Sequence, residues 1–140
     1  WLRNGNAISS AARGTYLLKA DDLNANVNIR VTISKTGYNN LVVQAIAKVV
    51  GLGSLIKTPT PLITGSYKVS STLTASPGVW DASSKLTYQW LRNGVAITGA
   101  TLKTYRLTSV DSKQSISVQV TANKVGYQSV TKTSSSGLVN

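Results

Sequence analysis

Trp90-Leu-Arg-Asn-Gly94 repeats the first five residues of the chain, Trp1-Leu-Arg-Asn-Gly5, at a distance of 89 positions. The match continues at the same spacing, pairing Ala7-Ile8 with Ala96-Ile97, Thr15-Tyr16 with Thr104-Tyr105, Asp22 with Asp111, Val31-Thr32 with Val120-Thr121 and Gly37-Tyr38 with Gly126-Tyr127. A self-match at one fixed spacing indicates a duplicated structural unit. The sequence therefore predicts a tandem array rather than a single fold.

The residues that lead into and follow Trp90 have the pattern of a β-strand and a hairpin. Leu86, Tyr88 and Trp90 alternate with polar residues and so fall on one face of a predicted strand. Asn93-Gly94 predicts a two-residue hairpin turn, because both central positions of that turn need positive φ. Residues 95–97 are then expected to form a short return strand.

Further strands are predicted at residues 68–75, 104–107, 115–122 and 128–134, after a first edge strand that follows Thr58-Pro-Thr-Pro61. The pattern is clearest in 115–122, where the inward residues are Ile116, Val118, Val120 and Ala122. About seven short strands in about eighty residues, with frequent turn signals between them, favour a two-sheet β-sandwich. We therefore expect an all-β fold.

The first copy holds only the part of this pattern that begins at the tryptophan. Val27, Ile29, Val31 and Ile33 take the inward positions, and residues 41–50 take the last strand. Without two leading strands, the inner face of this copy is expected to be exposed beside an unpaired sheet edge, which favours association. Three explanations are open: upstream residues absent from this sequence, a proteolytic remnant, or strands donated by a neighbouring chain.

The string Leu86-Thr-Tyr-Gln-Trp-Leu-Arg-Asn-Gly94 and the Asp before a Val-x-Val strand resemble an immunoglobulin-type domain without cysteines. With Pro77-Gly-Val-Trp80 and Lys124-Val-Gly-Tyr127, the unit is similar to bacterial immunoglobulin-like repeats, which occur in secreted actinobacterial wall lysozymes, other glycan hydrolases and surface proteins. The resemblance implies that Trp90 is the core tryptophan and that Leu73 and Val118 stand where the disulfide cysteines would lie. The usual tyrosine two residues before Val118 is missing, so Asp111 is expected to cap that turn alone.

This interpretation divides the chain into a truncated immunoglobulin-like module at residues 1–50, a linker at 51–58, a complete module at 59–136 and a tail at 137–140. The serine run Ser134-Ser-Ser136 predicts a flexible connection. The predicted core residues are Trp1, Trp90, Tyr88, Ile29 and Val118.

The composition limits the chemistry that this segment supports. It has no Cys, no His and no Glu, and its acidic residues are Asp21, Asp22, Asp81 and Asp111. General acid–base catalysis usually draws on His, Glu, Asp, Lys, Tyr or Cys, and three of these six are missing. The lack of cysteine excludes disulfides, thiol catalysis and Cys-ligated zinc. We expect no catalytic residue, no metal site and no cofactor here.

The chain is basic, with a net charge of +11. Such a charge favours anionic partners, but the Lys and Arg residues are spread singly and form no run or amphipathic helix. Two interpretations follow: weak, salt-sensitive attraction to anionic polymers, or solubility alone. Neither specific nucleic-acid binding nor membrane insertion is expected, since no apolar run reaches membrane-spanning length.

Five residues are candidates for contact with a glycan or an anionic polymer. Tyr38 with Lys35, and Tyr127 with Lys124, fall at the predicted tip that joins the last two strands. Each pair either caps its turn or presents an aromatic ring beside a cation. Trp80 follows Ser-Pro-Gly in a loop, where it either packs over the end of the sandwich or offers a sugar-stacking platform.

The expected function is that of a non-catalytic extracellular spacer or wall-binding module in a larger secreted or cell-surface protein. Its partners would be other domains of the same chain and anionic wall polymer or carbohydrate. One alternative is a subunit of an extracellular fibre or adhesin that neighbouring copies assemble through unpaired strands. Another is an accessory region of a glycan or peptidoglycan hydrolase.

Overall fold

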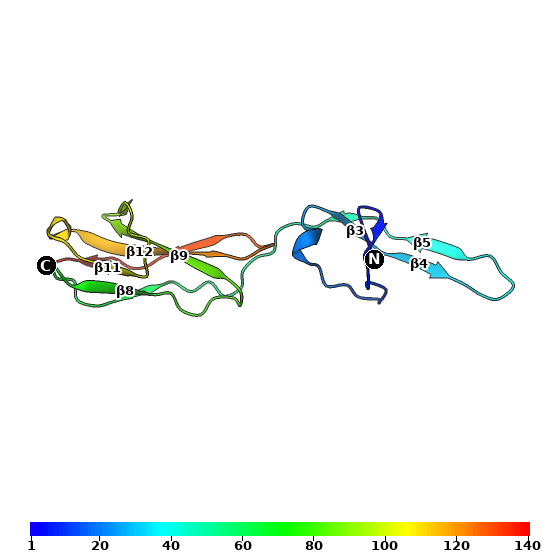
Figure 1. The fold of residues 1–140 in the computed structure, drawn as a ribbon, viewed down its shortest axis with the longest axis horizontal. Helices are drawn as coiled ribbons and strands as arrows, with labels where there is room; N and C mark the ends of the chain where they lie inside the picture. The colour runs from blue at the N-terminus through cyan, green and yellow to red at the C-terminus, as the bar shows by residue number, and fades with distance from the viewer. The chain divides into compact units, whose positions relative to one another are not determined.

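The computed structural model describes residues 1–140, and its regular structure is all β apart from two short 3-10 turns. The chain divides into two compact units, unit 1 at Trp1–Gly53 and unit 2 at Ser54–Asn140, and Figure 1 shows the strands of each. All strand pairings are antiparallel. None of its helical segments has the length and apolar character needed to cross a membrane. The all-β prediction is confirmed.

Unit 2 contains two sheets, an arrangement consistent with a β-sandwich. The larger sheet has the order β10-β9-β12-β13, and β14 also pairs with β12. Its strands are β9 Lys85–Arg92, β10 Val95–Ala96, β12 Ser115–Asn123, β13 Val130–Thr133 and β14 Gly137–Leu138. The smaller sheet has the order β11-β8-β7, with β7 Leu62–Thr64, β8 Thr72–Ser76 and β11 Thr104–Arg106. The turn η2, Ser109–Asp111, precedes β12.

The core of unit 2 consists of residues from both sheets. Leu73 and Ala75 of β8 pack in one cluster with Trp90 of β9 and Val118 of β12. A second cluster joins Val120 and Ala122 to side chains outside the strands. All four residues predicted to face inward on β12 are fully buried, which confirms the alternation. Full burial of a Val or Ile side chain stabilises the fold by about 1.5–3 kcal/mol.

Unit 1 has one sheet of four short strands and one separate two-stranded ladder. The sheet has the order β2-β1-β3-β6, and the ladder pairs β4 with β5. The elements are β1 Leu2–Arg3, β2 Asn6–Ala7, η1 Ala20–Asp22, β3 Asn26–Asn28, β4 Arg30–Ile33, β5 Leu41–Gln44 and β6 Lys48–Val49. In Figure 1 the β4–β5 ribbon projects from the rest of its unit.

The strand registers of the two units agree at the spacing of the sequence match. Arg30 pairs with Gln44 in unit 1, and Gln119 pairs with Thr133 in unit 2, so both partners are displaced by 89 positions (119 − 30 and 133 − 44). The hairpin turns agree as well. Asn93 and Gly94 have φ values of 48° and 80°, and Asn4 and Gly5 have 48° and 82°. The two-residue turn predicted from Asn-Gly is confirmed.

Two expected boundaries differ from the structure. In the expected linker at 51–58, Leu55 is buried against Trp80 and belongs to unit 2. The expected tail at 137–140 includes β14, and Val139 is fully buried in the core cluster of Trp90. The serine run is also ordered by contacts, because Ser134 Oγ accepts a hydrogen bond from the Val118 amide at 3.0 Å. Residues 137–140 are therefore a structural part of unit 2.

Two expected strands differ clearly from the structure, one by a later start and one by a division. The strand expected at 68–75 begins only at Thr72, because the Ser71 amide donates to the Lys68 carbonyl at 3.0 Å and closes a turn. Val69 is consequently exposed rather than inward. The strand expected at 41–50 divides into β5 and β6, since the chain leaves β4 at Ala45 and next pairs with β3.

Candidate functional site

A buried carboxylate, Asp111, connects strands and a turn in unit 2. One of its oxygens accepts hydrogen bonds from the backbone amide of Thr108 at 2.8 Å and from the Thr108 hydroxyl at 2.9 Å. The Tyr105 hydroxyl donates to the same oxygen at 2.9 Å, and Arg92 Nε donates to the other at 2.7 Å. Asp111 therefore does not cap this turn alone, because residues of β9 and β11 share it.

These contacts determine the charge state of the cluster. Burial raises the pKa of Asp111, but the hydrogen bonds from Thr108 and Arg92 outweigh burial, and the net pKa is lowered. The pKa of Tyr105 is raised, first by burial and then by its hydrogen bond to Asp111. At neutral pH the cluster therefore holds an ionised carboxylate beside a neutral phenol and a cationic guanidinium.

Unit 1 contains the same cluster 89 positions earlier. Asp22 accepts hydrogen bonds from Arg3 Nε at 2.6 Å, from the Tyr16 hydroxyl at 2.9 Å and from the Lys19 amide at 2.7 Å. Burial raises the pKa of Asp22, and the bonds from Lys19, Arg3 and Tyr16 lower it to a net value below the usual one. One polar difference is that Lys19 has no hydroxyl to replace that of Thr108.

The remaining acidic side chains, Asp81 and Asp21, take no part in the hydrogen bonds of these clusters. Asp81 accepts hydrogen bonds from the backbone amides of Ile56 and Lys57, and these bonds lower its pKa. They also hold the first residues of unit 2 against the Asp81 loop. Asp21 is exposed. No group of three or more His, Cys, Asp or Glu side chains converges on one point. The two buried carboxylates have their oxygens occupied by internal donors, which suits them to hold strands together.

The residues predicted for the core fall into two groups. Trp90 and Val118 are fully buried, and Leu73 lies in the same hydrophobic cluster. Trp90 stacks on Tyr105 and donates from Nε1 to the Leu102 carbonyl at 2.9 Å. Tyr88 is half-buried against both hydrophobic core clusters of unit 2. Trp1 and Ile29 are half-buried in unit 1. Trp1 retains the matching bond, from Nε1 to the Arg13 carbonyl at 2.9 Å.

Trp80 does not present a surface to a sugar. Its side chain packs against Leu55, Val120 and Ala122, and the residue is only 8% exposed. Its indole Nε1 donates to the Pro77 carbonyl at 2.9 Å. A stacking platform needs an exposed ring face, so the structure contradicts that interpretation and favours packing over the end of the sandwich.

Both tyrosine–lysine pairs form, but only one presents an open ring. Lys35 Nζ lies 4.7 Å from the centre of the Tyr38 ring, and Lys124 Nζ lies 4.3 Å from that of Tyr127, distances typical of cation–π contact. Tyr38 is 69% exposed, whereas Tyr127 packs against the cluster of Leu55 and Trp80. Tyr38 with Lys35 therefore stays a candidate contact for a glycan or anionic polymer.

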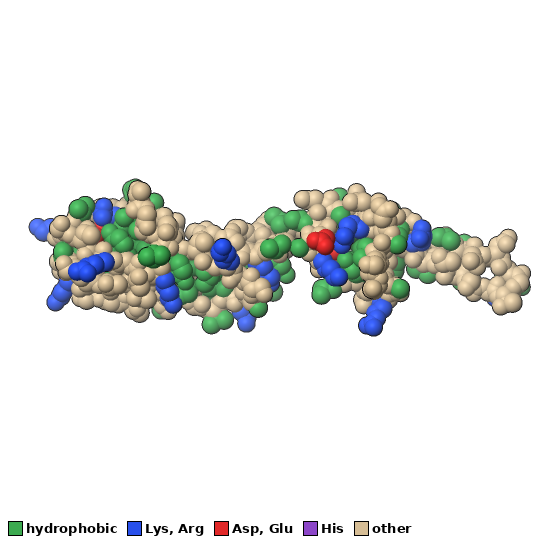
Figure 2. Space-filling view, in the orientation of Figure 1, with side chains coloured by type: hydrophobic (Ala, Val, Ile, Leu, Met, Phe, Trp, Pro, Cys, Tyr) green, Lys and Arg blue, Asp and Glu red, His purple; other side chains and the backbone are tan.

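Basic side chains are dispersed over the visible surface. Figure 2 shows Lys and Arg scattered between hydrophobic and neutral residues, with no large blue patch on the face in view. This matches the expectation of a diffuse positive field. Long-range attraction from such a field falls off beyond a Debye length of about 10 Å at 0.1 M salt.

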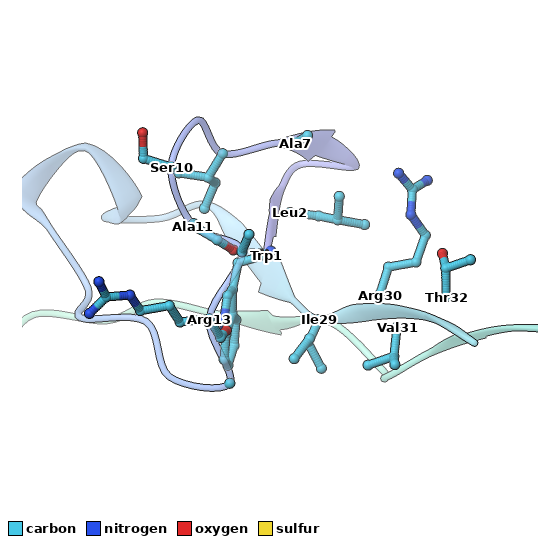
Figure 3. Close-up of a pocket in the computed structure, with 13 residues that line it drawn as sticks. Trp1, Leu2, Ala7, Ser10, Ala11, Arg13, Ile29, Arg30, Val31 and Thr32 are labelled. Carbon is cyan, nitrogen blue, oxygen red and sulfur yellow. Dashed lines mark hydrogen bonds between the residues drawn. The ribbon is translucent and has the colours of Figure 1, made fainter. Parts of the chain in front are cut away.

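Unit 1 also has an exposed apolar surface. We call it the open face and define it by Trp1, Leu18, Ile29, Val31 and Ile33. Val31 is 46% exposed and Ile33 is 53% exposed, as expected for an uncovered inner face. In Figure 3 the side chains of Ile29 and Val31 point to the side on which the Trp1 ring lies, while Arg30 and Thr32 point to the other. Leu18 also belongs here. Its match to Leu107 at the spacing of 89 could have identified it.

Two hollows adjoin the open face. One, of about 540 Å³, runs beside β4 and is lined by Trp1, Ala7, Ile29, Arg30, Val31 and Thr32 among others. The second, also about 540 Å³, is lined by Trp1, Leu18, Val27, Ile29, Ile46 and Val49 among others. The open face is therefore the best candidate interaction surface of the chain.

Comparisons with known protein families, with curated proteins and with solved structures give no significant match to this chain.

Proposed function

We propose that the chain is a tandem pair of immunoglobulin-like units, produced by duplication, that serves as a non-catalytic spacer or wall-binding module in a larger extracellular protein. The observation that carries the proposal is the recurrence, 89 residues apart, of the same cluster of Arg, Tyr and Asp around the same tryptophan. A repeated unit with its own core suits a role in which copies are added to set length.

The partner that fits the basic surface of the chain is an anionic polymer of the cell wall. The chain has 15 Lys and Arg residues and only 4 Asp, which leaves a net charge of +11. Dispersed cations suit a ligand that makes many weak contacts. The exposed ring of Tyr38 beside Lys35 is the best-placed single contact, because it combines an apolar face with a cation. The binding should therefore be weak and should depend on salt.

Co-sedimentation with purified bacterial walls tests the proposal. The chain is expected to sediment with the walls at about 0.02 M NaCl and to stay in the supernatant at about 0.5 M, because salt screens exposed charges. Tyr38→Ala combined with Lys35→Ala should weaken sedimentation. The matched control is Lys68→Ala with Val69→Ala, an exposed pair that forms no cation–π contact. A chain that stays in the supernatant at low salt lacks wall binding, and only the spacer role would survive.

A second candidate function is that of a fibre or adhesin subunit, and the open face is the observation that favours it. An apolar face beside an unpaired strand edge is the kind of surface through which copies assemble by strand addition. Electron microscopy of the purified chain distinguishes the two functions. Regular polymers would support the fibre, whereas dispersed monomers would support the module.

A further inference from the structure

We propose that the open face and the free edge of β4 bind a polypeptide segment whose sequence pattern is that of residues 54–89. The strand of this segment that pairs with β4 would continue directly into β1. The inference does not use wall binding, so it and the proposed wall contact can fail separately. It is carried by three features of unit 1, each of which has a covered counterpart in unit 2.

The first feature is the free edge of β4. In unit 2 the residues Gln119–Ala122 pair with β13 on one side and with residues 86–89 of β9 on the other. In unit 1 the matching residues, Arg30–Ile33, pair with β5 alone. Alternate residues of an antiparallel strand bond to alternate sides. Because the Ala45 amide donates to the Ile29 carbonyl, the amides of Arg30 and Thr32 face the free edge.

The second feature is the hollow beside that edge. It is lined by Ile29, Arg30, Val31 and Thr32 along β4 and by Trp1 at the start of the chain. The backbone of β9 occupies the corresponding place in unit 2, where Lys85 pairs with Asn123 and Tyr88 with Val120. A strand that enters here satisfies the free amides of β4.

The third feature is the apolar open face. The residues of unit 2 that match Leu18, Val31 and Ile33 are Leu107, Val120 and Ala122, and these are at most 1% exposed. Leu107 is covered in the cluster of Leu73 and Ala75 from β8, and Val120 and Ala122 are covered by Leu55 and Trp80. All four covering residues lie within residues 54–89. Residues 54–89 therefore show which kind of segment covers such a face, namely one that presents apolar side chains.

The direction of β1 specifies how the occupant is joined. In unit 2, β9 is continuous from Lys85 to Arg92, and its last two residues match Leu2 and Arg3 of β1. A strand beside β4 in this register is therefore collinear with β1. The β8 segment of a second copy does not fit the role, because Leu73 and Ala75 are already fully buried in their own unit.

The test copies residues 54–89 directly ahead of Trp1 in the full chain, so that they lead into Trp1 as they lead into Trp90. Hydrogen–deuterium exchange by NMR is then compared between this extended chain and the chain of residues 1–140. The amides of Arg30 and Thr32 are expected to gain protection of at least about 100-fold in the extended chain, because they acquire strand partners. Val31→Thr should be harmless in residues 1–140 and destabilising in the extended chain.

A matched control carries Leu73→Asp and Ala75→Asp in the added copy only. It has the same length and connection, but it places charges where apolar contact is needed, and it should give no added protection. Three results would overturn the proposal. They are unchanged exchange of Arg30 and Thr32 in the extended chain, collapse of the unit 1 resonances there, and protection of both amides in residues 1–140 by a dimer or polymer. The last result would make a second copy the occupant.

Discussion

Unit 1 and unit 2 share a hydrogen-bonded framework of Arg, Tyr and Asp side chains. Only in unit 2 does a second sheet pack against the strands next to this framework. Arg3, Tyr16 and Asp22 repeat the geometry of Arg92, Tyr105 and Asp111, down to the turn that precedes the next strand. Yet Trp90 is fully buried, whereas Trp1 is only partly buried. The strand-and-turn geometry is therefore encoded within about 25 residues of each tryptophan, whereas the apolar core depends on residues that come earlier.

The absence of a cover also explains a local difference in secondary structure. Residues Thr104–Arg106 form β11 because they pair with β8. The matching residues, Thr15 to Leu17, form no strand, and Leu17 is exposed. A strand in this position requires its partner, since an isolated extended segment has no ladder to satisfy its backbone.

The largest difference between the units is expected on removal of the tryptophan. Trp90→Ala deletes a fully buried side chain and should lower the free energy of unfolding of unit 2 by about 3–5 kcal/mol. Trp1→Ala should cost unit 1 clearly less, because part of that ring already contacts water. Urea titration followed by the NMR signals of each unit measures both losses in one sample per variant. Equal losses would mean that Trp1 is as covered as Trp90.

The carboxylate clusters should respond alike. Asp111→Ala leaves the partly buried Arg92 and Tyr105 side chains without their acceptor, and unit 2 should lose about 3 kcal/mol of unfolding free energy. Asp22→Ala should destabilise unit 1 in the same direction. The matched control is Asp21→Ala at the exposed neighbour, with a change within about 0.5 kcal/mol. A harmless Asp22→Ala would show that the shared framework does not stabilise unit 1.

A hydroxyl introduced at matched strand positions should also destabilise unit 2 more than unit 1, but the difference in unfolding free energy should be smaller. Val120→Thr buries an unpaired hydroxyl in the second core cluster and should cost about 1–3 kcal/mol. Val31→Thr places the same group on the open face, where water reaches it, and should change the free energy by less than about 0.5 kcal/mol. Thermal unfolding monitored by NMR for each unit gives both values. A comparable loss at Val31 would contradict an uncovered face.

The smallest expected effect is the acid dependence of stability. The pKa values of Asp22 and Asp111 are lowered in the folded chain from a normal value of 3.8. Their stabilisation is therefore fully present above about pH 4 and is lost as the pH falls through the folded pKa. Asp111→Asn should flatten this dependence for unit 2 and leave it in unit 1. Urea midpoints at a series of pH values test this, and an unchanged slope in unit 2 would assign its acid sensitivity elsewhere.

The sequence predicted the features that depend on local pattern. Alternation from Ile116 to Ala122 indicated the central strand, and Asn93-Gly94 indicated the hairpin, because both signals are contained in a few neighbouring residues. The carboxylate cluster was missed, since Arg92 and Asp111 lie 19 positions apart and meet only after folding. Val139 was missed for a similar reason. A short strand at the end of the chain has no alternation to reveal it, and its burial depends on pairing with β12.

Of the candidate contact residues, the sequence predicted proximity but not exposure. The Lys–x–Gly–Tyr spacing correctly indicated that Lys35 and Lys124 lie beside their tyrosines. Whether a ring is open to a ligand depends on distant neighbours. Tyr127 and Trp80 are covered by residues that include Leu55, which is far from both in sequence. Exposure of Tyr38 is a property of unit 1, where no such residue is present.

Amide exchange in the unmodified chain tests the central claim most directly. At neutral pH, the account predicts that the amides of Arg30 and Thr32 exchange almost as fast as those of an unstructured peptide, because they face the free edge of β4. The matching amides of Gln119 and Thr121, which are paired with β9, should exchange only when unit 2 unfolds. Equal protection of the two pairs in a monomeric chain would contradict the account, because the edge of β4 would then already be covered.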